Sequence, residues 1–314
     1  MNIKRAFQSI AFINEPYTRW KWRERRTSWG EENPDKTFFI VRRASCKVGL
    51  FSLVMTNMGL VRYALEMGYI PVIDMKSGAN TYLEEEEVGK KNAWEFYFEQ
   101  PCGYTLEDVA NSKNIILSDG MITDKNVFPT YEIARNEEEF QMWHSFFREY
   151  LHVKQEIREE AEAVRRELFA GGRVLGVLCR GTDYVQQRPK NHPIQPQVEE
   201  MIGKASEVME QYDCAWIYLA TEDEGAFRKF SQTFGDRLKV TQAGRCENIG
   251  NRNINDISYG RDRERYLKGK EYLINIILLA ECDCIVAGSA GGTYGAMLMN
   301  ENYEYRYVYD LGVY

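Results

Sequence analysis

Residues 176–185 read GVLCRGTDYV, and this stretch decides how the second half of the chain folds. The apolar residues before Arg180 predict a buried strand, which stops abruptly at the polar run that ends in Asp183. A guanidinium is planar, stays charged and offers a fork of donors that matches two phosphate oxygens. An arginine at the end of a buried strand therefore favours a phosphate site. The alternative is a local ion pair between Arg180 and Asp183.

Short apolar runs alternate with helix-like segments on both sides of this stretch. In the first half, residues 36–43, 49–68 and 69–75 have a β-α-β pattern, and 76–135 is predicted as insertion and loop with a strand at 114–120. A charged helical stretch at 137–172, with a break near His152, follows. Further strands are expected at 173–179, 215–221, 237–242, 282–288 and 305–312, with helices at 196–211, 222–234 and 265–281.

This alternation predicts an α/β protein with two Rossmann-like doubly wound domains. The length of 314 residues fits two domains of about 100–200 residues each. We expect an acceptor-side N-terminal domain over 1–150, and a bridging helix with a nucleotide-binding domain over 151–314.

Charge and composition exclude several classes of protein. A formal net charge of -7 argues against a nucleic-acid binder, because such proteins need a positive field to displace counterions from phosphates. No signal peptide and no run of 18 apolar residues is found, so we expect a cytoplasmic protein. The sequence lacks H-E-x-x-H and clustered His/Cys ligands, so no metal and no cofactor are expected.

Two more polar clusters follow predicted strands and should share an edge of the sheet with Arg180, because parallel strands end on the same side. Residues Ser289, Gly291 and Gly292 precede a helix-like run, where small residues let backbone N–H groups approach an anion. A plain tight turn with close packing is equally compatible with them.

The other cluster runs from Thr221 to Glu224. Its spacing fits a capping box, in which Thr221 caps the helix and Glu224 lies three residues later. The functional alternative is a contact of Glu222 or Asp223 with a sugar or ribose, or a role as general base.

The segment 17–29 interleaves aromatic and basic residues. Such a segment suits peripheral contact with an anionic membrane surface. The alternative is a solvated arm whose aromatic side chains lie on the domain.

The stretch GVLCRGTDYV, with NHPI at 191–194, resembles the phosphate-binding motif of the fucosyltransferases that include the α-1,6-, nodulation and protein O-fucosyltransferases. The matching residues, in order, are Arg180, Thr182, Asp183, His192 and Pro193. The resemblance covers roughly 173–300, with a weaker likeness at 38–75. The chain departs from the family at Leu178, where a histidine is expected, and at Gly181, where a second arginine is expected.

The resemblance implies a GT-B fold, in which two Rossmann-like domains face a cleft, and GDP-fucose or another GDP-sugar as donor. Arg180, Thr182 and His192 would then belong to the phosphate-binding motif. The turn Ser289 to Gly292 would hold the phosphates from the other side. Thr221, Glu222 and Asp223 would lie near the nucleotide or sugar, and Asn275 would stand where the family places an aspartate that reads guanine.

The function expected from this resemblance is inverting, metal-independent transfer of fucose to a glycan or lipid-linked glycan. The reaction would belong to polysaccharide or glycoconjugate biosynthesis. If the protein is peripheral, it would act at the inner membrane face. Arg180 would stabilise the departing diphosphate. The base would be Asp183, or otherwise Glu95 or Asp223. Two alternatives remain open: a GT-B enzyme with another nucleotide-sugar donor, and a non-catalytic protein that binds nucleotide-sugars or glycans.

Overall fold

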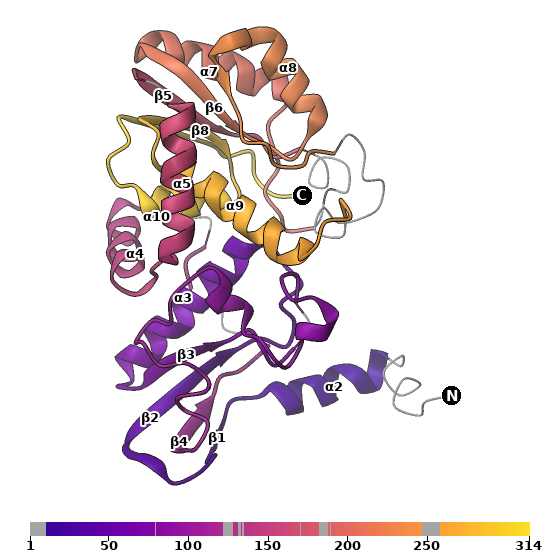
Figure 1. Ribbon diagram of the computed structural model, residues 1–314, viewed down its shortest axis with the longest axis vertical. Helices are drawn as coiled ribbons and strands as arrows, with labels where there is room; N and C mark the ends of the chain where they lie inside the picture. The colour runs from indigo at the N-terminus through magenta and orange to yellow at the C-terminus, as the bar shows by residue number, and fades with distance from the viewer. Residues whose placement is uncertain are drawn as a thin grey trace. The chain divides into compact units, whose positions relative to one another are not determined.

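The computed structural model describes residues 11–78, 80–121, 128–130, 133, 135–169, 171–181, 188, 190–246 and 258–314. The predicted site residues Thr182 and Asp183 lie outside these ranges. The chain forms two compact units (Figure 1). The first unit contains Met1–Val48, Ser52–Pro129 and Tyr150–His152, and the second contains Gly49–Phe51, Thr130–Glu149 and Val153–Tyr314. The segment 130–149, placed in the first domain by the sequence, thus groups with the second unit.

The described part of the first unit holds a four-stranded sheet with strand order β1-β4-β2-β3. Its strands are β1 (Arg25–Thr27), β2 (Glu32–Arg42), β3 (Ile70–Asp74) and β4 (Ser112–Leu117). β2 is parallel to both β3 and β4, and β1 is antiparallel to β4. Residues 38–41 of β2 are all buried, as expected of a parallel strand whose two faces are both covered.

The helix α3 (Leu50–Glu66) connects β2 to β3, which confirms the predicted β-α-β pattern. Gly68, with φ at +73°, provides the left-handed turn after this helix. The helix α2 (Ala11–Trp22) precedes the sheet, and the short helices η1 (Glu85–Glu87) and η2 (Ala93–Phe96) lie within the region predicted as insertion and loop. The strand predicted at 114–120 is β4.

The described part of the second unit holds a parallel five-stranded sheet with strand order β7-β6-β5-β8-β9. Its strands are β5 (Arg173–Leu178), β6 (Cys214–Ala220), β7 (Leu238–Lys239), β8 (Cys284–Gly288) and β9 (Tyr305–Tyr309). All five were predicted, although β7 is shorter than expected. β6 and β7 are added on one side of β5, and β8 and β9 are added on the other side, so the sheet is doubly wound.

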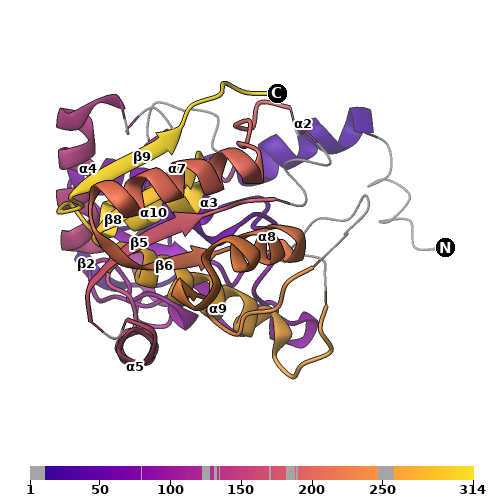
Figure 2. The same ribbon diagram turned by 90° about the horizontal axis from the view of Figure 1, so that it is seen from above.

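Helices cover both faces of this sheet, with α7 and α8 on one face and α9 on the other. The described helices of the second unit are α4 (Glu137–Tyr150), α5 (Gln155–Leu168), α7 (Val198–Gln211), α8 (Glu224–Phe234), η5 (Gly235–Arg237), α9 (Glu264–Ala280) and α10 (Gly291–Met299). Figure 2 shows α7 across one face. There Met201 of α7 shares a core with Leu175 and Val177 of β5. On the other face, Gly176 lies against Leu279 of α9, since a Cβ at Gly176 would be 3.1 Å from the Leu279 side chain.

The long charged stretch at 137–172 forms two helices, α4 and α5, with the break at 151–154. The prediction of an interruption near His152 is therefore confirmed. The two doubly wound α/β units agree with the fold class predicted from the sequence.

Candidate functional site

The second unit has a point at which its strand order reverses. β5 comes first in the chain, β6 and β7 are added on one side of it, and β8 and β9 on the other. In doubly wound sheets ligands bind at this point, beyond the carboxyl ends of the strands. The register pairs Leu178 with both Ala220 and Ala287, so β5, β6 and β8 end together. The clusters that begin at Arg180, Thr221 and Ser289 therefore lie along one edge of the sheet.

The loop after β5 lies directly against the loop after β6. The Cys179 N–H donates to the Ala220 carbonyl at 3.1 Å, and Arg180 follows, half-buried. A Cβ at Gly181 would lie 2.3 Å from Oδ2 of Asp223, so only glycine fits this approach. The absence of a second arginine here is thus linked to the position of the Asp223 carboxylate.

The predicted capping box at 221–224 is wrong. Helix α8 begins at Glu224, and its N-cap is Asp223, whose Oδ1 accepts a hydrogen bond from the Ala226 N–H at 2.8 Å. The Thr221 hydroxyl instead accepts from the Asp223 N–H at 3.1 Å. Aspartate caps helices as well as threonine does, and the helix begins two residues later than predicted, so Asp223 takes the role expected of Thr221.

The position of Glu222 is fixed by main-chain hydrogen bonds to Cys246. Its carbonyl accepts from the Cys246 N–H at 2.9 Å, and the Glu224 N–H donates to the Cys246 carbonyl at 3.0 Å. These bonds place the chain after β7 beside the loop that carries Glu222 and Asp223.

The turn after β8 leads straight into α10. Ser289 is buried, and its hydroxyl lies 2.9 Å from the Tyr294 hydroxyl. The N-cap, Ala290, has no side chain that could cap the helix, so the first N–H groups of α10 lack a side-chain acceptor among the described residues. Such a helix start is suited to an anion.

The two glycines of this turn differ. A Cβ at Gly292 would lie 2.4 Å from the Tyr272 hydroxyl of α9, so Gly292 is required for close helix packing. Gly291 is only half-buried. Close packing against α9 thus explains why residue 292 is a glycine. The proposed binding of an anion concerns the backbone N–H groups at the start of α10.

Gln195 is a residue of this edge that sequence reasoning missed. Its side chain is 3% exposed, and its Nε2 donates to the Ser289 carbonyl at 2.8 Å and to the Pro193 carbonyl at 3.2 Å. Its Oε1 lies 2.1 Å from where a Cβ on Gly288 would stand. Gln195 therefore fixes the turn after β8, and its only sequence signal is its place just after NHPI.

We expect the substitution Gly288→Ala to destabilise the second unit by about 1–3 kcal/mol, because the added methyl group would displace the Gln195 amide. Urea unfolding measures this change. The double variant Gln195→Ala with Gly288→Ala serves as the control, since it removes the clash and should lose less than the sum of the two single variants. A single variant as stable as the parent would contradict this account of the turn.

His192 has its main-chain partners at the end of the chain. The Tyr314 N–H donates to the His192 carbonyl at 3.1 Å, and the Ile194 N–H donates to the Gly312 carbonyl at 2.9 Å. The His192 side chain is exposed. The segment that follows the Arg180 loop is thereby tied to residues 312–314.

Asn275, predicted at the position that reads the base, lies on α9. Its Oδ1 accepts hydrogen bonds from the Tyr218 hydroxyl and from the Thr241 hydroxyl, each at 2.8 Å. Burial raises the pKa of Tyr218 well above its usual value, so this phenol stays a neutral donor. The Asn275 oxygen therefore links α9 to β6 and to the segment after β7.

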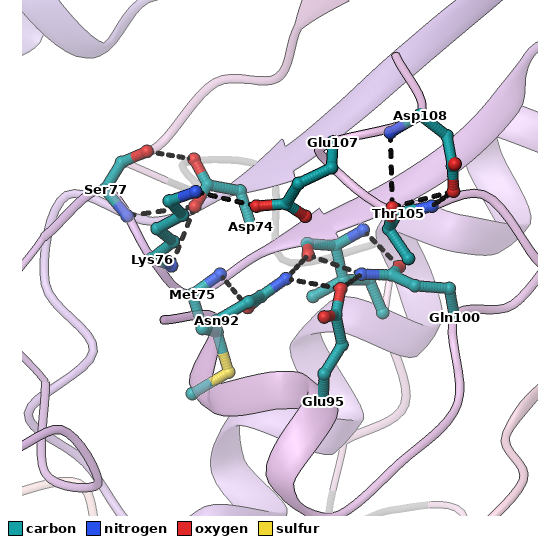
Figure 3. A network of polar contacts seen from close by, with 11 residues as sticks. Asp74, Met75, Lys76, Ser77, Asn92, Glu95, Gln100, Thr105, Glu107 and Asp108 are labelled. Atoms are coloured by element: carbon teal, nitrogen blue, oxygen red, sulfur yellow. Dashed lines mark hydrogen bonds and ion pairs between the residues drawn. The ribbon is translucent and has the colours of Figure 1, made fainter. Parts of the chain in front are cut away.

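Glu95 lies in the first unit, on η2, within a network at the end of β3 (Figure 3). Its Oε1 accepts from Asn92 Nδ2 at 3.0 Å and from Gln100 Nε2 at 2.8 Å. Both amides are buried. The other carboxylate oxygen of Glu95 has no hydrogen-bond partner among the described residues, so the group is oriented but retains an acceptor.

The same two amides cover the outer side of β3, the edge strand of its sheet. Gln100 Oε1 accepts from the Ile73 N–H at 2.8 Å, and Nε2 donates to the Ile73 carbonyl at 3.0 Å. Asn92 Oδ1 accepts from the Met75 N–H at 2.9 Å. The position of Glu95 is thus fixed by groups that also complete the backbone hydrogen bonds of β3.

Within the described residues, no group of three or more His, Cys, Asp or Glu side chains is arranged to hold a metal ion. A surface hollow lies at the opposite, amino end of the second unit's sheet and is lined by 172–173, 213–216 and Arg237. Arg237 donates there to the Ala215 carbonyl at 3.1 Å, which indicates a structural role for this arginine. We therefore place the candidate site at the carboxyl edge.

In sequence comparisons, no protein-family model and no curated protein matches the chain. Solved structures do match it. An α-1,6-fucosyltransferase NodZ soaked with GDP-fucose has a TM-score of 0.51 and 17% identity, over 84% of this chain and 93% of that chain. The fucosyltransferase NodZ from Bradyrhizobium gives 0.50 and 16% over the same shares. POFUT1 in complex with GDP-fucose gives 0.53 and 8%, over 89% of this chain and 99% of that chain. The chain has the GT-B fold of these fucosyltransferases.

Proposed function

We propose that the protein is a glycosyltransferase that moves fucose from GDP-fucose to a glycan hydroxyl. One observation carries the proposal: Arg180 and the uncapped start of α10 follow the two strands, β5 and β8, at which the strand order reverses. A guanidinium and a helix N-terminus both favour a diphosphate. The proteins of this fold named above were studied with GDP-fucose, which agrees with this donor.

The proposed reaction is a single displacement with inversion. The acceptor oxygen bonds to the anomeric carbon as the bond from that carbon to the β-phosphate oxygen breaks, and the electron pair leaves with GDP. Arg180 and the first N–H groups of α10 stabilise the charge that develops on the diphosphate, so the step needs no metal. The acceptor proton passes to a carboxylate.

The sequence favours Asp183 as this carboxylate, and two described carboxylates compete with it. Asp223 uses Oδ1 to cap α8, and its Oδ2 lies against Gly181. Glu95 has one oxygen held by two amides and a second oxygen without a hydrogen-bond partner in the described part of the chain. Of the two, Glu95 is better arranged to take a proton.

Calorimetric titration with GDP, UDP, ADP and CMP tests the donor class, and incubation with GDP-fucose, with and without glycan acceptors, tests the chemistry. We expect GDP to bind most tightly and fucose to be released or transferred. Failure of GDP to bind would overturn the proposal. A protein that binds GDP-fucose but neither hydrolyses nor transfers fucose over long incubation would be a binding module.

A GT-B enzyme with another nucleotide-sugar is the second candidate. Two observations favour it: the Asn275 oxygen is already used by Tyr218 and Thr241, and Leu178 is buried in β5. Neither residue then supplies the contacts to guanine that the family motif implies. A preference for UDP, ADP or CMP in the titration would select this candidate.

We further propose that the acceptor is a glycan or lipid-linked glycan in polysaccharide or glycoconjugate synthesis, and that 17–29 contacts a membrane at its cytoplasmic face. Tyr17 and Trp20 of α2 are 55% and 59% exposed, and the Arg23 guanidinium lies over the Trp20 ring at 4.8 Å. Among the helices of the described residues, none combines the length and apolar character needed to cross a bilayer.

We expect the protein to sediment with vesicles that contain phosphatidylserine and not with vesicles of phosphatidylcholine, because the basic residues of 17–29 require an anionic surface. The variant Trp20→Ala should weaken binding, since it removes an exposed aromatic ring. The variant Met67→Ala, which changes another exposed apolar residue, is the control. Equal sedimentation with both kinds of vesicle, or with neither, would contradict this contact.

A further inference from the structure

The sheet of the first unit also has a point at which its strand order reverses. β2 is the first of its parallel strands, β3 lies on one side of it and β4 on the other. The pairing of β2 and β4 continues past both strands, because the Ala44 N–H donates to the Gly120 carbonyl at 2.8 Å. Arg43 is the first residue after β2. It therefore stands where the topology of such a sheet places ligands.

The neighbouring Arg42 shows what a structural arginine looks like at this edge. Its Nε donates to the Ser118 carbonyl and its Nη2 to the Arg23 carbonyl, each at 3.1 Å. Its guanidinium also lies over the Trp22 ring at 5.0 Å. The donors of Arg42 thus bond to main-chain carbonyls, and this arginine has a structural role.

Arg43 is arranged differently. Its guanidinium makes a single long hydrogen bond, from Nη1 to the Thr56 hydroxyl oxygen at 3.4 Å. That hydroxyl donates its own proton to the Ser52 carbonyl at 2.7 Å. No described carboxylate pairs with Arg43, although its side chain is half-buried. The sequence has no acidic residue between Arg43 and Glu66.

The Cys46 thiol does not provide a negative charge that could pair with the Arg43 guanidinium. Burial raises the pKa of this thiol to about 11, even though Arg43 acts in the opposite direction. The thiol is therefore neutral near pH 7. Burial also lowers the pKa of Arg43, but a guanidinium remains protonated in proteins, so the site keeps a positive charge that no described residue neutralises.

We propose that Arg43, with Lys47 in the loop that follows, binds a phosphate or carboxylate group of a ligand at the carboxyl edge of β2. A partly buried charge without a partner costs stability, and a ligand anion would offset this cost. The five donors of the guanidinium match two anionic oxygens. The anion is either the phosphate of a phosphorylated acceptor or the carboxylate of an acidic sugar, and the inference does not depend on the donor being GDP-fucose.

The first test compares Arg43→Met with Arg42→Met by thermal unfolding of the full chain without ligand. We expect Arg43→Met to keep or raise Tm, because it removes a partly desolvated charge and one long hydrogen bond. Arg42→Met should lower Tm by roughly 2–6 °C, because it removes donors to two backbone carbonyls. If Arg43→Met is destabilised as much as Arg42→Met, Arg43 is a structural cation and the proposal fails.

The second test titrates inorganic phosphate, GDP-fucose and glucuronate into the parent, Arg43→Met, Arg43→Lys and the control Arg62→Met, whose arginine pairs with Glu66 on the exposed side of α3. We expect Arg43→Met to bind at least one anion about tenfold or more weakly, with Arg43→Lys in between. Weaker phosphate binding identifies a phosphorylated ligand, with or without a parallel loss of GDP-fucose binding, and weaker glucuronate binding alone identifies an acidic sugar.

The proposal is overturned if the parent binds none of the three anions, or if Arg43→Met binds all of them as Arg62→Met does. These results are separate from the nucleotide titration. If GDP binds tightly to the parent and to Arg43→Met alike, and no other anion is affected, the proposed fucose transfer is retained. The proposed anion site at Arg43 is then wrong.

Discussion

Replacement of Arg180 by alanine should lower the rate of fucose transfer, or of GDP-fucose hydrolysis, by about 10²–10³. The diphosphate gains negative charge as the bond to the anomeric carbon breaks, and Arg180 is the fixed charge at the end of β5, beside the strand β8 that leads into α10. Single-turnover rates with GDP-fucose measure the chemical step, and calorimetry measures any loss of GDP affinity.

Arg173→Ala is the matched control, because Arg173 begins the same strand at its other end. It donates to the Tyr212 carbonyl at 3.0 Å and pairs with Glu304, away from the carboxyl edge. Its variant should keep the parental rate. Parental rates for Arg180→Ala, with the same circular dichroism spectrum, would remove Arg180 from the mechanism and with it the observation that carries the proposed function.

The second large effect is expected for Glu95→Gln, which should reduce kcat for transfer by about 10²–10⁴ and leave GDP affinity unchanged. The substitution keeps the shape of the side chain and an oxygen that Asn92 and Gln100 can donate to, but it removes the basic group. Steady-state kinetics with varied donor and acceptor separates the fall in kcat from any change in KM.

Glu107→Gln tests whether loss of a nearby carboxylate is enough to produce this effect. Glu107 belongs to the same region (Figure 3) and pairs with Lys76 at 2.8 Å, and its side chain is 64% exposed. We expect this variant to retain the parental kcat. If Glu95→Gln also retains it, Glu95 only supports the network, and Asp183 becomes the carboxylate to examine.

The buried parallel strands of both sheets could be predicted from the sequence because their residues are apolar on both faces, whereas the polar edge strand β1 (Arg25–Thr27) was not predicted. Residues 38–41 and the run before Arg180 are continuous apolar stretches, which is typical of parallel strands covered on two sides. The order of strands and helices then fixes which ends meet. This is why the clusters at Arg180, Thr221 and Ser289 could be placed on one edge before the structure was known.

The contacts that orient the site could not be predicted in the same way. Gln195 reaches Ser289 across a large separation in sequence, and Gln100 reaches Ile73 in the first unit. A buried amide has no periodic pattern around it, because its partners are backbone groups that every residue carries. The capping error at 221–224 has a local cause: Thr221 and Asp223 are both good caps, and the sequence pattern does not distinguish them.

The amide cover on β3 has a consequence for how the protein behaves in concentrated solution. An edge strand whose N–H and C=O groups face outward can pair with a strand of another molecule, which is a common route to aggregation. In this chain, the Gln100 amide already occupies the Ile73 N–H and carbonyl, and the Asn92 amide occupies the Met75 N–H. This part of β3 is therefore closed to strand addition, and the residues that hold Glu95 also protect the folded chain from self-association along that edge.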